Sequence, residues 1–222
     1  MLELPRRADA LLRGTVNAPE SRRTVIDSLT LIVGCGLFYG AAMGTWGGST
    51  PLGRPLQVFY SAVKVPMLLL VTFGLSLPSF FVINTIVGLR SDFAKALGAL
   101  LDGQAAAALV LAALAPLTLT WYASSDFYQA NVAFNGVMFL IAALTGQFAL
   151  RRSYRPLIDR DARHKKMLRY WLVVYCFVAI QLAYVLRPFI GSPGQPTQFF
   201  RAGAWENAYE QLARLLWQIV RK

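Results

Sequence analysis

The sequence predicts an all-α fold: an integral membrane bundle of five transmembrane helices, followed by an amphipathic C-terminal helix. Five long stretches lack Asp, Glu, Lys, Arg and His altogether, and each is about as long as a membrane-crossing helix. Hydrophobic residues make up 56% of the chain and charged residues only 15%, as is typical of membrane proteins. A water-soluble helix of such length would carry charges on its outer face. We therefore divide the chain into a polar N-terminal segment (1–25), a five-span domain (26–190) and a C-terminal segment (191–222).

The five apolar stretches define the expected spans, and the charged residues between them are expected in the connections outside the bilayer. Two spans contain internal prolines, which predict kinks because proline removes a helical hydrogen bond. In chain order the stretches are Ser28–Gly53, Val65–Leu89, Gly103–Ser125, Phe127–Leu150 and Tyr170–Leu186.

The first span carries a column of glycines at four-residue spacing. Gly36, Gly40 and Gly44 share one helix face, and Gly48 continues the repeat. Because glycine has no side chain, this face allows another helix to approach closely in the membrane. We expect the column to be a helix-packing surface for another span of the same chain, with self-association or a partner helix as the alternatives.

Uncharged polar residues form an expected cluster inside the membrane. Asn131 and Asn135 lie on one face of the fourth span, and Gln181 and Tyr184 lie one turn apart on the fifth. Asn135 and Gln181 should sit at similar depth in the outer leaflet. We predict interhelical hydrogen bonds between these spans; a hydrated path for a solute or ion is the alternative.

Basic residues predict the orientation of the spans. An N-terminus in the cytoplasm places 15 Lys and Arg residues in cytoplasmic segments and seven on the other side, as the positive-inside rule favours. The densest cluster connects the fourth and fifth spans and is expected to contact anionic lipids. Its residues are Arg151, Arg152, Arg155, Arg163, Lys165 and Lys166. The net charge of +11 is explained by these connections, so we expect no nucleic-acid partner.

Residues for catalysis are sparse. No nucleophile-and-base or metal-ligand motif is present, and the single histidine, His164, falls in a basic stretch where we expect a solvated loop. Cys35 and Cys176 both lie in apolar stretches and are expected to be free thiols. Proton-coupled transport also loses support, because proton relays use ionisable groups within the membrane. We expect no enzyme activity, no metal and no cofactor.

The C-terminal segment begins with a Gly/Pro-rich break. Beyond it, residues 202–220 place apolar side chains on one face and charged side chains on the other, which predicts an amphipathic helix on the membrane surface or on a partner. The apolar face includes Trp205, Leu212, Leu216 and Ile219.

Five spans with short connections and a polar N-terminus give the chain a layout that resembles the Yip family of small membrane proteins. The nearest local similarity is Pro51-Leu52-Gly53-Arg54-Pro55 before the second span, which departs from the acidic, tyrosine-bearing signature of that family. The resemblance implies a five-span arrangement, and eukaryotic members associate with Rab GTPases and vesicle traffic. No functional residue transfers to this sequence.

These observations favour a non-enzymatic assembly factor, scaffold or membrane-organising component. It would act through helix packing and contact with lipids, a membrane protein partner or a second copy of itself. The alternative is a small-solute transporter or channel subunit that uses the polar cluster. The expected location is the bacterial inner membrane.

Overall fold

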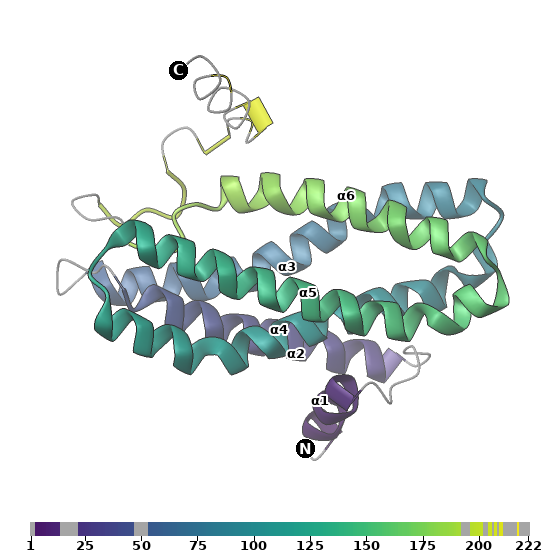
Figure 1. The fold of residues 1–222 in the computed structure, drawn as a ribbon, viewed down its shortest axis with the longest axis horizontal. Helices are drawn as coiled ribbons and strands as arrows, with labels where there is room; N and C mark the ends of the chain where they lie inside the picture. The colour runs from purple at the N-terminus through teal and green to yellow at the C-terminus, as the bar shows by residue number, and fades with distance from the viewer. Residues whose placement is uncertain are drawn as a thin grey trace.

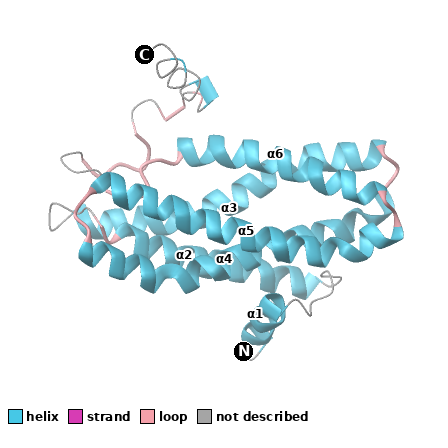
Figure 2. Cartoon of the chain, in the orientation of Figure 1, coloured by secondary structure: helices cyan, strands magenta, loops and turns pink. Residues whose placement is uncertain are grey.

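The computed structural model is a bundle of long helices (Figure 1). It describes residues 3–13, 22–46, 53–191 and 196–201, together with Ala204, Trp205, Asn207, Tyr209, Glu210 and Trp217. Within these residues every regular element is helical (Figure 2). The elements are α1 (Glu3–Arg13), α2 (Arg22–Gly44), α3 (Gly53–Ile86), the short 3-10 helix η1 (Arg90–Asp92), α4 (Phe93–Ser124), α5 (Tyr128–Arg160) and α6 (Arg163–Val185).

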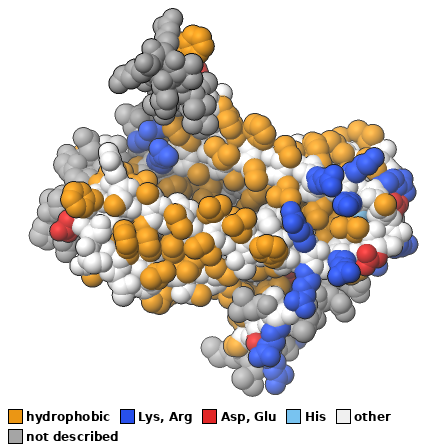
Figure 3. All heavy atoms as spheres, in the orientation of Figure 1, with side chains coloured by type: hydrophobic (Ala, Val, Ile, Leu, Met, Phe, Trp, Pro, Cys, Tyr) orange, Lys and Arg blue, Asp and Glu red, His pale blue; other side chains and the backbone are white. Residues whose placement is uncertain are grey.

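Helices α2 to α6 confirm the predicted all-α fold with five spans. In the described part of the chain, five helices are long and apolar enough to cross a membrane. Their apolar side chains form most of the surface around the middle of the bundle (Figure 3). The predicted C-terminal helix falls almost entirely on residues outside the described ones.

The helices extend beyond the apolar stretches. With 33 residues, α5 is about 50 Å long, whereas the hydrocarbon core of a bilayer is about 30 Å thick. Two charged residues that we expected in the connections between helices, Lys64 and Asp102, lie within α3 and α4 and are fully buried. Their placement in connections was wrong because α3 and α4 each start well before their apolar stretches.

The helices do not pack in the order of the sequence. α2 contacts both α3 and α4, α5 packs on α4, and α6 packs on α3, whereas α5 and α6 make few contacts although a two-residue turn joins them. α4 is the most buried of the five. At the α3–α6 interface the Trp171 ring lies 5.6 Å from that of Phe73 and 5.3 Å from that of Phe80.

The glycine column of α2 packs directly against α3. A methyl group built on Gly40 would lie 2.3 Å from the backbone oxygen of Ser61, and one on Gly44 would lie 2.7 Å from the Cα of Val58. A methyl group built on Gly36 would lie 3.2 Å from the nearest atoms of Pro66. Because such separations are too short for real Cβ contacts, this interface needs glycine at Gly40 and Gly44.

Helix α1 lies across the direction of the bundle, near the end where α3 turns into α4 and α5 turns into α6 (Figure 1). Leu11 is buried against this end, whereas Arg6 and Arg13 remain exposed. We call this end of the molecule the basic end, because most of the Lys and Arg side chains visible in Figure 3 gather there.

Candidate functional site

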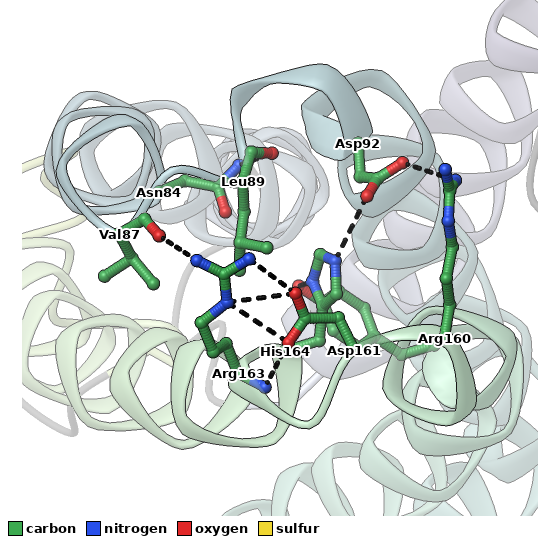
Figure 4. Close-up of polar contacts among 9 residues, drawn as sticks. Asn84, Val87, Leu89, Asp92, Arg160, Asp161, Arg163 and His164 are labelled. Carbon is green, nitrogen blue, oxygen red and sulfur yellow. Dashed lines mark hydrogen bonds and ion pairs between the residues drawn. The ribbon is translucent and has the colours of Figure 1, made fainter.

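At the basic end, Asp92 is the centre of a group of polar side chains from three elements (Figure 4). Its carboxylate accepts a 3.1 Å hydrogen bond from Nη1 of Arg160, and its second oxygen lies 3.5 Å from Nε2 of His164. The other imidazole nitrogen, Nδ1, lies 3.3 Å from the Tyr154 hydroxyl. Asp92 comes from η1, Arg160 and Tyr154 from α5, and His164 from α6. These contacts therefore join the α3–α4 connection to the α5–α6 turn.

The position of His164 corrects the expectation of a solvated loop residue. α6 begins at Arg163, so His164 lies in its first turn and is fully buried. It shares this buried face with Met167, Leu168 and Trp171, at the three- and four-residue spacing of a helix. The spacing was present in the sequence, but the surrounding basic residues concealed it.

A second ion pair closes the α5–α6 turn. Asp161 accepts hydrogen bonds from the side chain of Arg163 at 2.7 Å and from its backbone N–H at 2.9 Å. These bonds lower the pKa of Asp161 to about 2. Arg163 also donates to the backbone oxygen of Val87 at 2.8 Å, which connects this turn to the end of α3 (Figure 4).

The Asp92, His164 and Tyr154 side chains lie in sequence, but Nε2 of His164 is buried without a hydrogen-bond partner, so they do not form a continuous hydrogen-bonded chain. His164 and Tyr154 are each fully buried. Among the described residues, no group of three His, Cys, Asp or Glu side chains is placed to hold a metal ion. These contacts connect η1 with the adjoining ends of α5 and α6.

A third charged contact holds α1 on the bundle. Arg7 donates to Oδ1 of Asp102 at 2.7 Å and to the hydroxyl of Ser28 at 2.9 and 3.1 Å. The second oxygen of Asp102, Oδ2, is buried without a hydrogen-bond partner. The sequence does not reveal this site, because the partner of Asp102 lies 95 residues away in a separate helix.

The basic residues predicted to contact lipid are all exposed and flank the α5–α6 turn. Arg155 lies 3.8 Å from Asp159, and Arg163 pairs with Asp161. For the remaining four, the structure gives no carboxylate partner within the residues it describes: Arg151, Arg152, Lys165 and Lys166.

The predicted membrane cluster divides between two parts of the bundle. Asn135 accepts from the Tyr39 hydroxyl of α2 at 3.2 Å and donates to the Tyr122 hydroxyl of α4 at 2.6 Å. It also donates to the backbone oxygen of Asn131 at 2.7 Å. Asn131 in turn bonds to the Trp121 indole and to the Ser125 carbonyl group.

Gln181 and Tyr184 lie on α6, away from these bonds. The expected hydrogen bond between Asn135 and Gln181 is not formed, because α5 packs on α4 whereas α6 packs on α3. Gln181 and Tyr184 are both half-buried. The Tyr184 ring lies 5.7 Å from the Arg187 guanidinium and 4.2 Å from that of Arg201.

The fold and its charged end together define a helical protein with the features of a multipass membrane protein. No protein-family model matches the chain, and no similar curated protein or solved structure was found. Its function is therefore inferred from the geometry.

Proposed function

We propose that this protein is a non-enzymatic, membrane-organising component of the bacterial inner membrane, with its N-terminus in the cytoplasm. It gathers anionic lipids, or a membrane protein partner that prefers them, around its basic end. The observation that carries the proposal is the set of exposed bases on α5 and α6 that have no carboxylate partner among the described residues, directly beside the apolar surface.

Charge and position both support lipid contact. Each basic residue near an anionic membrane surface adds about 1 kcal/mol of attraction. Arg151 immediately follows the apolar stretch that ends at Leu150, so its side chain lies at headgroup depth. The Arg160–Asp92 ion pair and the hydrogen bond from Arg163 to the Val87 oxygen connect the α3–α4 connection with the α5–α6 turn, which holds these bases on a fixed frame.

The alternative, a solute path through the Asn131 and Asn135 region, receives less support. The amide groups of both residues bond to protein atoms from α2, α4 and α5. Interhelical hydrogen bonds of this kind contribute about 0.6 kcal/mol each to helix association. These asparagines therefore act as contacts between helices.

Lipid composition around the purified protein tests the proposal. The full chain is reconstituted in bilayers that contain phosphatidylglycerol and phosphatidylcholine, and the lipids retained on gentle extraction are measured by mass spectrometry. Phosphatidylglycerol should be enriched, and the variant with Arg151, Arg152, Lys165 and Lys166 changed to Gln should lose most of this enrichment. A control that exchanges Arg and Lys at the same four positions should keep it. Equal lipid composition for all three proteins would refute the proposal.

A further inference from the structure

An open cavity of about 300 Å³ lies on the surface of α6. Five of its six lining residues come from the apolar stretch Tyr170–Leu186, and the sixth comes from the C-terminal segment. Val173, Phe177 and Ile180 each remain more than half exposed. In a helix that crosses a bilayer, such a surface meets acyl chains. The lining residues are Leu172, Val173, Cys176, Phe177, Ile180 and Tyr209.

Tyr209 closes one side of this cavity. Its ring lies 5.2 Å from the Phe177 ring, and its hydroxyl donates to the Phe177 backbone oxygen at 2.6 Å. Because the hydroxyl has an acceptor, the ring can stay against α6 in apolar surroundings. Tyr209 therefore gives an exposed helix face a side wall.

The face of α6 that lines the cavity leads to two positive charges at the end of the helix. Cys176, Ile180 and Tyr184 follow one another at four-residue spacing, which puts them on one face. Arg187 lies just beyond the end of α6. The Tyr184 ring lies close to the guanidinium groups of both Arg187 and Arg201, at 5.7 and 4.2 Å.

The charges of Arg187 and Arg201 are not balanced within the described part of the chain, where no carboxylate pairs with either guanidinium group. Nε and Nη2 of Arg201 are enclosed without a hydrogen-bond partner, whereas Arg187 is exposed. Two like charges beside one ring repel each other. An anion that reaches Arg187 from the surface would relieve this repulsion.

The separation between the cavity and the two charges matches the dimensions of a phospholipid. The cavity residues of α6 precede Tyr184 by four to twelve positions, which is roughly 6 to 18 Å along the helix. The hydrocarbon of one leaflet is about 15 Å deep, half of the bilayer core. A phospholipid with its headgroup at Arg187 therefore has its acyl chains at the depth of the cavity.

We propose that this side of α6 binds one anionic phospholipid, in the leaflet opposite the basic end. Its phosphate lies against the guanidinium groups of Arg187 and Arg201, whose planar N–H donors suit phosphate oxygens. One acyl chain occupies the cavity beside Phe177 and Tyr209. An apolar cavity alone would suit any lipid, and the pair of charges selects an anionic headgroup. The site is separate from the bases at the basic end, so it does not depend on the function proposed above.

Photolabelling with two matched lipids tests this proposal. The full chain is reconstituted in phosphatidylcholine nanodiscs with a small fraction of a phospholipid that carries a diazirine in one acyl chain. The headgroup of this probe is phosphatidylglycerol or phosphatidylcholine, and mass spectrometry locates the labelled residues. Residues 172–180 of the wild type should react about fivefold more with the phosphatidylglycerol probe, which is the attraction of one basic residue for an anionic headgroup. Equal labelling by the two probes would overturn the proposal.

Charge variants connect this preference to the two arginines. Arg187→Gln/Arg201→Gln should remove it, and Arg187→Lys/Arg201→Lys should keep most of it. Arg151→Gln/Arg152→Gln should leave the labelling of residues 172–180 unchanged, which separates this site from the basic end. If the double Gln variant does not fold, Arg187→Gln removes the exposed charge alone and should lower the preference. An unchanged preference in the Gln variants would contradict the assignment.

A cavity variant tests the position of the acyl chain. Ile180→Trp fills the cavity but keeps both charges, and should reduce labelling of residues 172–179 by the phosphatidylglycerol probe. Val137→Trp is the matched control, because Val137 is an exposed apolar residue on α5. If a second copy of the chain or a partner helix covers the cavity instead, neither probe will label this segment in the wild type, and the proposal is overturned.

Discussion

The guanidinium of Arg7 lies 2.7 Å from the carboxylate of Asp102 and fastens the N-terminal helix to the most buried helix of the bundle. Asp102 is completely enclosed, and Arg7 retains 10% of its side-chain exposure. The two partners therefore differ in what their loss would leave behind. Without Asp102, Arg7 can move to the headgroups, but without Arg7 the acid remains in the interior.

Arg7→Gln should therefore destabilise the protein more than Asp102→Asn does. Breaking a buried ion pair by removal of one partner costs about 3–5 kcal/mol, and the penalty is largest for the partner that cannot reach water. Arg6→Gln is the matched control, because Arg6 is the exposed neighbour on the same helix. Thermal unfolding in detergent measures the effect. Equal losses for Arg6→Gln and Arg7→Gln would contradict the role given to Arg7.

Gly40→Ala should lower stability, whereas Gly34→Ala should leave it unchanged or raise it. Alanine is favoured over glycine in a helix by about 1 kcal/mol, and a Cβ on Gly34 meets no atom within 4 Å. At Gly40 the added methyl would overlap the Ser61 backbone oxygen, and overpacking costs about 1–3 kcal/mol. Unfolding in mild detergent should order the proteins as Gly34→Ala, wild type, Gly40→Ala. The reverse order would show that this face of α2 is not the packed one.

Labelling from the two sides of the membrane checks the proposed orientation. In a background without Cys35 and Cys176, cysteines are introduced at Asp126 and Ala162, which are exposed in the α4–α5 and α5–α6 connections. An impermeant maleimide added to intact cells should modify position 126 and spare position 162, which should react after the membrane is opened. Modification of both positions from outside would exclude five spans with a cytoplasmic N-terminus.

The α5–α6 turn should resist acid until the pH falls well below the usual range for a carboxyl group. The pKa of Asp161 is lowered to about 2 by the hydrogen bonds of Arg163. The stabilisation from this contact is therefore fully present above the unfolded-state pKa of about 3.9 and is lost as the pH falls through about 2. The Asp161 carboxyl ¹³C shift, recorded against pH, should show this low midpoint. In Arg163→Gln the midpoint should move toward 3.9, and an unchanged midpoint would show that another group lowers the pKa.

The number and position of the membrane-length helices could be predicted from the sequence, because hydrocarbon excludes charge over about 20 consecutive residues and leaves a clear signal. The helix ends were predicted less well. Residues 151–160 continue α5 as a helix beyond the apolar stretch, where water is available and charge no longer marks a boundary.

The buried charges could not be predicted from the sequence. Lys64 and Asp102 each stand beside an apolar stretch and look like ordinary boundary residues, and only tertiary structure brings Pro188 and Arg7 to them. The hypothesis for Asn135 had the same weakness. It assumed that α5 and α6 are neighbours because they are consecutive, whereas the bonds of Asn135 run to Tyr39 on α2 and Tyr122 on α4.

The order in which the helices pack has a consequence for biogenesis. Phe73 and Phe80 on α3 are covered by Trp171, which is synthesised about 90 residues later, after two further helices have entered the membrane. We expect this face of α3 to stay in contact with lipid, or with the insertion machinery, until the last helix emerges. The bundle is then completed late, when α6 packs against α3, a helix synthesised before α4 and α5.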